Sequence, residues 1–352
     1  MVYSITKRPV RVGRAHGRKV GTMAQRATIR WGILGAGGIA HRFARSLAHE
    51  PGSVLAAISC RTPAKAEEFA REFGIERVYT DADGEDASHR RLLADSDIDA
   101  IYLALPHGLH RAWALRALEA GKAVLCEKPA MLSATEMREV AAASHAHGAL
   151  FMEAMKVRFE PAYRELRRLL DAGATGEVTR VETRLLGEAD LQALEASSYY
   201  FDPVQGGVLL DMGTYCASWL ADLLPADLAV TRVERACVHG VDVWDRAEFA
   251  APNGVTALLE CGCDRPGPRT ARVVGTKGVI EVNLPHRPDA LRIAYPVDAE
   301  PREVRMPYEV DDFYPQIAHF CDLVRTGAGE SPIMPPAASV RCAEILDAIR
   351  NG

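Results

Sequence analysis

The chain has 352 residues, 48% of them hydrophobic and 25% charged, and a formal net charge of −5. These values are close to those of an average globular protein, so they exclude intrinsic disorder of the chain as a whole and a collagen-like structure. No apolar run approaches the ~18 residues of a transmembrane helix. The length predicts about two domains.

The charge is unevenly distributed along the chain. Residues 1–27 contain seven basic residues and no acidic one, whereas the remainder carries 35 basic and 47 acidic residues, a net charge of −12. An acidic body of this size is a poor binder of nucleic acid, and we expect neither a nucleic-acid nor a membrane partner. The basic segment could bind a polyanion or direct export, but it lacks a secretory apolar stretch and a twin-arginine pair. We therefore expect residues 1–27 to be a disordered extension, with Met23 as a candidate start.

The eight cysteines are scattered, and several lie within apolar runs as buried thiols do. This usage is typical of a reducing compartment, so we expect a cytoplasmic protein. Cys261 and Cys263 are the only close pair, and neither a second pair nor a histidine stands at zinc-ligand spacing. We predict that there is no metal site.

The region 28–152 alternates short apolar runs with amphipathic stretches. This pattern predicts a parallel, doubly wound α/β sheet with helices on both faces, that is, a dinucleotide-binding Rossmann domain. The expected strands are 29–34, 54–59, 77–79, 98–104, 122–126 and 149–152, and the expected helices lie near 38–49, 63–73, 85–94, 107–120 and 133–147.

The region 153–352 has a different pattern of apolar and polar residues. Consecutive strand-like runs separated by tight turns predict a large, mostly antiparallel sheet in an α+β domain for substrate binding and oligomerisation. The expected strands are 177–186, 228–239, 244–250, 254–262, 270–275 and 278–283, and the expected helices are 160–171, 208–223, 312–326 and 336–350. We expect the last two helices to pack back on the Rossmann domain.

A glycine-rich loop follows the first strand and opens the first helix. Its pattern, G-x-G-x-x-A, allows a tight turn, a close approach of a pyrophosphate to the backbone, and close packing of helix on strand. The N-terminus of the helix then offers free N–H groups to the anion. The alternative is a glycine-rich turn in a domain that binds no cofactor. The loop consists of Gly35, Ala36, Gly37, Gly38, Ile39 and Ala40.

The end of the second strand predicts which dinucleotide binds. NAD-selective sites place an Asp or Glu here to bond the ribose hydroxyls, and this chain has none. Ser59, Arg61 and Thr62 can instead bond a 2′-phosphate, and Lys65 lies one helical turn away. NADP is therefore the expected cofactor, with NAD as the alternative.

Two segments contain residues suited to proton transfer. Lys128 follows the strand 122–126 at the carboxyl edge of the sheet, where ligands of such sheets bind. Asp211 and Tyr215 are four residues apart and would share one face of a helix. A tyrosine can exchange a proton with an alcohol if a nearby lysine eases its ionisation, although from the sequence alone Tyr215 is more simply a core residue.

The sequence resembles the Gfo/Idh/MocA family of oxidoreductases from about residue 28 to the end. Within that family it looks most similar to the branch of dimeric dihydrodiol dehydrogenases and NADP-dependent D-xylose dehydrogenases. The segments that carry the resemblance are GILGAGGIA at 32–40, LPHGLHRAWALRALEAGKAVLCEKPA at 105–130, FMEAMKVRFEPAYRELRRLL at 151–170, GGVLLDMGTYC at 206–216, VVGTKGVIEV at 273–282 and SPIMPP at 331–336.

The resemblance implies roles for particular residues. Tyr215 would be the general acid–base and Lys128 its partner, and Asp211 would line the substrate pocket. A loop beside the nicotinamide would contain Pro106, His107 and His110, and we count the neighbouring Leu105 and Glu127 among the cofactor candidates. Arg158 matches an arginine near the cofactor, although it could equally form an ion pair.

Together these patterns predict an NADP-dependent oxidoreductase acting on a sugar or polyol, with oxidation of an aldose at C1 favoured. A dihydrodiol or dicarbonyl substrate, and a non-catalytic NADP sensor, are the alternatives. The stretch 188–205 matches no known specificity pattern, and Tyr199–Phe201 stand where many relatives have an arginine. The resemblance also implies a homo-oligomer, a dimer or tetramer, formed through the large sheet.

Overall fold

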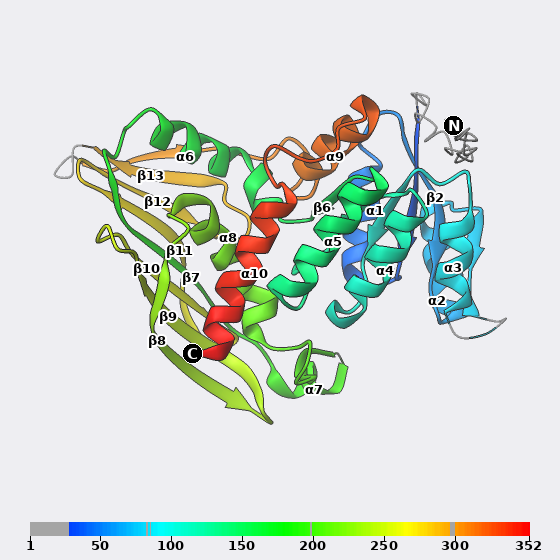
Figure 1. Cartoon of the computed structure of the whole chain (residues 1–352), viewed down its shortest axis with the longest axis horizontal. Helices are drawn as coiled ribbons and strands as arrows, with labels where there is room; N and C mark the ends of the chain where they lie inside the picture. Colours follow the sequence, from blue (N-terminus) through cyan, green and yellow to red (C-terminus); the bar gives the residue numbers. More distant parts are fainter. Residues whose placement is uncertain (1–27, 82–83, 85, 198, 296–299) are drawn as a thin grey trace, which may run out of the picture.

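Two sheets of different kinds organise the protein (Figure 1). The computed structural model describes residues 28–352 except 82–83, 85, 198 and 296–299, so the predicted N-terminal extension lies outside the described residues. A parallel sheet occupies one end of the molecule and a larger, mostly antiparallel sheet the other. The predicted fold class is confirmed.

The first sheet has six parallel strands in the order β3-β2-β1-β4-β5-β6. Every residue of β4 and β5 is buried, as expected for central strands covered by helices on both faces. The strands are β1 (Ile29–Leu34), β2 (Ser53–Ser59), β3 (Arg77–Tyr79), β4 (Ala100–Leu103), β5 (Ala123–Cys126) and β6 (Phe151–Glu153). The order reverses between β1 and β4, and ligands of doubly wound sheets bind at this switch point.

Five helices connect these strands, close to the ranges expected from the sequence. They are α1 (Gly38–Leu47), α2 (Pro63–Phe73), α3 (Ala87–Ala94), α4 (His107–Glu119) and α5 (Ala134–His147). The start of α5 illustrates how local sequence sets a boundary. The Ser133 hydroxyl accepts a hydrogen bond from the Glu136 amide at 3.2 Å, which satisfies one of the free N–H groups of the first turn.

The second sheet has eight strands in the order β14-β13-β12-β11-β7-β10-β9-β8. All neighbours are antiparallel except β7 and β10. The strands are β7 (Val178–Glu188), β8 (Ala229–Val238), β9 (Val241–Ala250), β10 (Thr256–Gly262), β11 (Asp264–Gly275), β12 (Val279–Asn283), β13 (Ala290–Ala294) and β14 (Arg302–Arg305).

The sequence did not predict β13, β14 or the early start of β11. The edge strand β14 contains mostly charged residues, so it lacks the alternation of apolar residues that signals a strand. The first part of β11 includes Pro266 and Pro268, and its pairing with β7 is interrupted between Arg265 and Arg269. Prolines are compatible with a sheet at such an irregularity, but in a sequence they predict a loop.

The remaining helices lie on the large sheet or connect it with the Rossmann domain. They are η2 (Lys156–Phe159), α6 (Pro161–Asp171), α7 (Leu191–Ser197), η3 (Tyr199–Phe201), the π-helical turn η4 (Leu209–Gly213), α8 (Thr214–Leu223), α9 (Tyr314–Thr326) and α10 (Pro336–Asn351). Figure 1 shows α10 running between α5 and α8, and it contacts both. A hydrogen bond of 2.9 Å from the Ala134 amide to the Asp347 carboxylate fixes α10 on the Rossmann domain.

The two faces of the large sheet differ in chemistry. Along β7, Val181 and Leu185 belong to the hydrophobic core. The alternating positions carry charges, such as the Arg180–Glu182 ion pair at 2.6 Å. A homo-oligomer formed through this sheet stays a prediction. Among the described residues, no helix is both long and apolar enough to span a bilayer.

Candidate functional site

The glycine-rich loop has the geometry of an anion-binding turn. Gly35 adopts a φ of +99°, which residues with a side chain rarely adopt. A Cβ at this position would lie 2.4 Å from the carbonyl oxygen of Ala104, in the loop after β4, so only glycine fits. Gly37 is the N-cap of α1 and no side chain caps the helix. A Cβ on Gly37 or Gly38 would meet nothing within 4 Å. The first turn of α1 therefore faces open space, which fits a pyrophosphate held by backbone N–H groups.

The end of β2 only partly matches the predicted 2′-phosphate site. Arg61, Thr62 and Lys65 are all exposed beside the start of α2 and can reach a phosphate. Ser59 is fully buried, and its hydroxyl lies 2.6 Å from Nδ1 of His89. The Ser59 side chain is thus engaged within the Rossmann core, and we leave it out of the proposed phosphate site.

The first turn of α4, which follows β4, contains two histidines of the predicted cofactor site. Nδ1 of His107 donates to the Gln205 carbonyl at 3.0 Å, and the Tyr199 hydroxyl lies 3.3 Å from its Nε2. Burial, with His110 and Lys128 nearby, lowers the pKa of His107 to about 3. His107 is therefore a neutral ring that connects the Rossmann domain to the segment before α8.

His110 has a different environment from His107. It is completely buried, with Nε2 2.8 Å from the Leu105 carbonyl and Nδ1 3.0 Å from the Pro129 carbonyl. These two carbonyls belong to the loops after β4 and β5. His110 therefore links the loops after β4 and β5 by contacts with one carbonyl of each, and its ring does not face open space.

Lys128, Asp211 and Tyr215 meet where the two halves of the chain join. Lys128 follows β5, Asp211 lies in η4, and Tyr215 lies in the first turn of α8. Nζ of Lys128 donates to both the side-chain and the backbone oxygen of Asp211, each at 2.7 Å, and lies 4.9 Å from the centre of the Tyr215 ring. The structure thus brings Asp211 and Tyr215, which are four residues apart in the sequence, together with Lys128 in one cluster.

The charges of this cluster set its protonation at neutral pH. Burial acts to lower the pKa of Lys128, but Asp211 outweighs it and raises that pKa. Burial raises the pKa of Tyr215 above its usual value, while the Lys128 ammonium opposes the rise. Tyr215 is consequently a protonated phenol beside a permanently charged lysine.

Glu127, the residue before Lys128, is hydrogen-bonded through both of its carboxylate oxygens. The Tyr102 hydroxyl donates to one carboxylate oxygen of Glu127, and the Lys128 amide donates to the other at 3.2 Å. Burial raises the pKa of Glu127, and the bond from Tyr102 opposes that rise. Both oxygens are bonded within the protein, so Glu127 positions Lys128.

Sequence reasoning missed a second basic group beside Tyr215. Lys156, in η2, is buried, forms an ion pair with Asp312, and has its Nζ 5.7 Å from the centre of the Tyr215 ring. Its Nζ also donates to the His286 carbonyl at 2.9 Å, and the His286 ring centre lies 5.8 Å from that of Tyr215. The position of Lys156 in the mostly apolar segment 151–159 was the local signal for this residue in the sequence.

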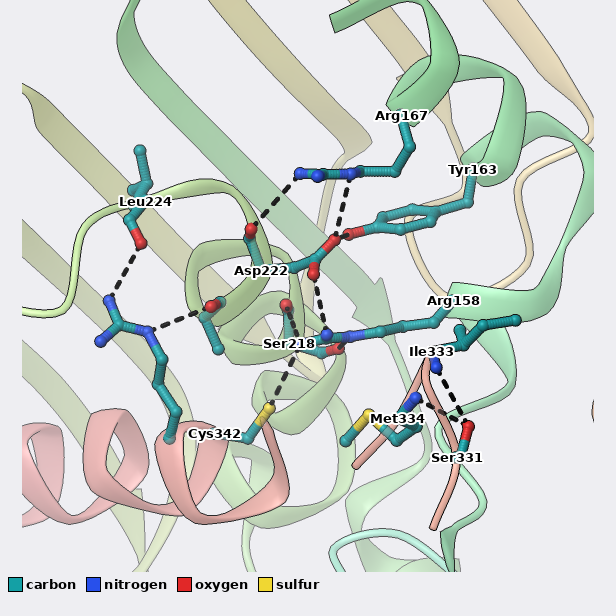
Figure 2. Close-up of polar contacts among 12 residues, drawn as sticks. Arg158, Tyr163, Arg167, Ser218, Asp222, Leu224, Ser331, Ile333, Met334 and Cys342 are labelled. Carbon is teal, nitrogen blue, oxygen red and sulfur yellow. Dashed lines mark hydrogen bonds and ion pairs between the residues drawn. The ribbon is translucent and has the colours of Figure 1, made fainter. Parts of the chain in front are cut away.

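Arg158 lies in a buried network away from the glycine-rich loop. Figure 2 shows its guanidinium pointing to Asp222 and Ser218 on α8 and to Cys342 on α10. The Arg158–Asp222 pair is 2.9 Å long, and the Tyr163 hydroxyl donates to the same carboxylate at 2.5 Å. Of the two roles open to Arg158 in the sequence, the structure gives it the ion pair.

Comparisons with known proteins agree with this architecture. Residues 29–155 match the family model described as an oxidoreductase family with an NAD-binding Rossmann fold, and residues 163–281 match the GFO/IDH/MocA C-terminal domain. The chain belongs to the Gfo/Idh/MocA family of oxidoreductases. Its relatives in this family include two trans-1,2-dihydrobenzene-1,2-diol dehydrogenases, one from Mus musculus at 34% identity and one from Homo sapiens at 30% identity. Each alignment covers 92% of this chain and 96% of the relative.

Solved structures extend the family comparison to whole folds. The 3-ketoreductase KijD10 from Actinomadura kijaniata, in complex with NADP and TDP-benzene, is 28% identical, covers 92% of this chain and 98% of its own, and gives a TM-score of 0.81. The aldose-aldose oxidoreductase of Caulobacter crescentus shares the fold, with a TM-score of 0.80 at 24% identity and coverage of 92% and 97%. This Gfo/Idh/MocA member is thus an oxidoreductase with an NAD-binding Rossmann domain.

Replacing Arg158 separates its two possible roles. We expect Arg158→Met to lower the free energy of unfolding by about 3 kcal/mol, because it removes the buried cation that bonds to the Asp222 carboxylate and to Ser218. The dissociation constant for NADPH should stay unchanged, since Arg158 does not face the glycine-rich loop. Chemical denaturation and fluorescence titration measure the two quantities. Arg158→Lys, which keeps the charge, should lose less stability, and a large loss of NADPH affinity with normal stability would contradict the assignment.

Two glycines of the cofactor loop should respond differently to the same substitution. Gly35→Ala should destabilise the protein by at least ~1–2 kcal/mol, because alanine disfavours positive φ and its Cβ meets the Ala104 carbonyl. Gly37→Ala should keep the melting temperature and weaken NADPH binding by about tenfold, since its Cβ would enter the space left for the pyrophosphate. Thermal unfolding and NADPH titration of both variants provide the comparison. Equal NADPH affinity in Gly37→Ala and wild type would show that the loop does not hold the cofactor.

Proposed function

We propose that this protein is an NADP-dependent oxidoreductase that moves a hydride between the nicotinamide and a carbon bearing a hydroxyl or carbonyl on a sugar or polyol. Oxidation of an aldose at C1 is the favoured reaction. The observation that carries the proposal is the position of the Lys128 ammonium, bonded to Asp211 and 4.9 Å from the centre of the Tyr215 ring. A positive charge beside a buried phenol is what acid–base catalysis by tyrosine requires.

The cofactor would lie along the carboxyl edge of the parallel sheet. The first turn of α1 at Gly37 and Gly38 would hold the pyrophosphate, and Arg61, with Thr62 and Lys65, would hold the 2′-phosphate. The loop from Leu105 to His107 would lie beside the nicotinamide, which accepts or supplies the hydride when bound. The solved relative KijD10 in complex with NADP supports this choice of cofactor.

Tyr215 would move the proton that accompanies the hydride. In oxidation the substrate hydroxyl loses its proton to the Tyr215 oxygen while the hydride leaves the same carbon, and in reduction both steps reverse. Since burial raises the pKa of Tyr215, the phenol begins protonated, which is the form that donates the proton in reduction. For oxidation this proton must first pass to solvent. The Lys128 ammonium stabilises the phenolate, and Asp211 holds that ammonium in place.

A dihydrodiol or dicarbonyl substrate is the second candidate. The curated relatives that are trans-1,2-dihydrobenzene-1,2-diol dehydrogenases favour it, and the proton-transfer chemistry would be the same. A sensor that binds NADP without turnover is the remaining alternative, and Lys128 together with Tyr215 argues against it. A homo-oligomer and a cytoplasmic location stay predictions.

Removing the Tyr215 hydroxyl tests the proposed chemistry. We expect Tyr215→Phe to lower kcat by about 10²- to 10⁴-fold, because the acid–base group is lost, with NADPH affinity unchanged. Initial rates with NADP and NAD are measured on D-xylose, D-glucose, D-galactose, myo-inositol and a trans-dihydrodiol. Tyr295→Phe, which changes an exposed tyrosine (52% exposed), is the matched control and should behave as wild type.

The pattern of rates on this panel distinguishes the alternatives. Turnover of a pyranose with NADP, lost in Tyr215→Phe, supports the proposed function. Turnover of the dihydrodiol alone supports the second candidate. Full activity in Tyr215→Phe would remove Tyr215 from the mechanism, and tight NADP binding without any turnover would favour a sensor.

Arg61 should determine the preference between the two dinucleotides. Arg61→Ala should weaken NADP binding about 10- to 100-fold, because a charge-assisted bond to the 2′-phosphate is lost, and leave NAD binding within about twofold. The measurement is the dissociation constant of each dinucleotide. Arg71→Ala, an exposed arginine at the other end of α2, should change neither. Equal losses for NADP and NAD in Arg61→Ala would contradict the assignment.

A further inference from the structure

His286 lies next to the proposed acid–base residue but takes no part in the proton transfer described above. It belongs to the loop between β12 and β13, far in sequence from Lys128 and Tyr215. Its ring centre is 5.8 Å from that of Tyr215. The imidazole is therefore part of the surroundings of the Tyr215 ring.

A buried ion pair holds the backbone at His286. Nζ of Lys156 donates to the His286 carbonyl at 2.9 Å, and the same ammonium pairs with Asp312. Arg42 of α1 pairs with the other oxygen of Asp312 at 2.5 Å. The backbone at His286 is thus bonded to a lysine of η2 whose carboxylate partner also pairs with the Rossmann domain.

The burial of one nitrogen indicates which tautomer the ring adopts. Nδ1 of His286 is buried, and no group among the described residues hydrogen-bonds to it. A buried N–H without an acceptor is rarer and more costly than a buried lone pair without a donor. The neutral tautomer that avoids this cost carries its proton on Nε2. Burial, with Lys156 and Arg287 nearby, lowers the pKa of His286 to about 3, so the ring is neutral.

We propose that His286 is a specificity-determining residue whose Nε2–H donates a hydrogen bond to a substrate oxygen other than the one on the reacting carbon. This inference rests on the proposed function and narrows its substrate class to compounds with several hydroxyl groups. The oxygen that reacts is taken by Tyr215, so the bond to His286 requires a second oxygen. A compound that places a hydrocarbon edge against His286 leaves the N–H without an acceptor, and sites with an unpaired polar group discriminate strongly.

The two lysines near Tyr215 are paired within the protein. Their carboxylate partners are Asp211 for Lys128 and Asp312 for Lys156. The groups that face His286 are Lys156, Arg287, Arg269 and Asp312. Neither ammonium group is therefore left free for a substrate carboxylate or phosphate, whereas substrate hydroxyl groups can donate to Asp211 and accept from His286.

The test compares His286 variants on whichever sugar of the panel the wild-type enzyme oxidises. We expect His286→Phe to raise KM about 3- to 10-fold, the effect of losing one uncharged hydrogen bond, with kcat within about twofold and unchanged NADPH affinity. His286→Gln, which keeps an N–H donor, should recover part of the loss. His147→Phe, an exposed histidine at the end of α5, is the matched control.

Deoxy analogues of the same sugar identify the hydroxyl that is contacted. One analogue should raise the KM of the wild-type enzyme by a similar factor and show no further increase with His286→Phe, because both changes remove the same bond. NADPH binding by each variant reports that it is folded. Unchanged KM in His286→Phe on a sugar that depends on Tyr215 would overturn the role of His286 alone. Turnover of the dihydrodiol and of no sugar would overturn both this inference and the proposed function.

Discussion

The contact between Lys128 and Asp211 is the interaction on which the candidate site depends. The lysine follows β5 of the parallel sheet, and the aspartate lies in the π-helical turn that leads into α8. One ammonium thus joins the two halves of the chain at the place where a substrate would meet a cofactor. A pair of this kind, with a buried lysine and a partly exposed aspartate, contributes little net stability, because desolvation and solvent screening offset the attraction. Its value is geometric, since it fixes the lysine beside the Tyr215 ring.

The rest of the second domain holds α8 in the position that this contact requires. At its start, the Asp242 carboxylate of β9 accepts from the Leu209 amide at 2.7 Å, and Gly207 has a φ of +93° beside that carboxylate. A side chain at Gly207 would overlap Asp242, with a Cβ 2.1 Å from its oxygen. Near its end, Arg158 bonds to Ser218 and Asp222 (Figure 2). The helix is therefore fixed at both ends by groups that take no part in the chemistry.

A second lysine–aspartate pair also lies near Tyr215. Lys156 and Asp312 are both buried, and Arg42 extends the pair to α1 of the Rossmann domain. Two ammonium groups, each paired with a carboxylate, thus lie near the phenol.

Lys128, Asp211 and Tyr215 took their proposed roles from the family resemblance. The sequence by itself determined the fold class, the order of most elements and the glycine-rich loop. These follow from local patterns, because a strand, a glycine turn and a helix depend on residues a few positions apart. Ser59 and Arg158 show the limit of such patterns, since only the structure reveals that the Ser59 hydroxyl lies beside His89 and that Arg158 pairs with Asp222. The edge strand β14, Lys156 beside Tyr215, and His286 were decided by tertiary structure alone. Each depends on partners distant in the sequence, and pairing of that kind leaves no periodic signal in a single chain.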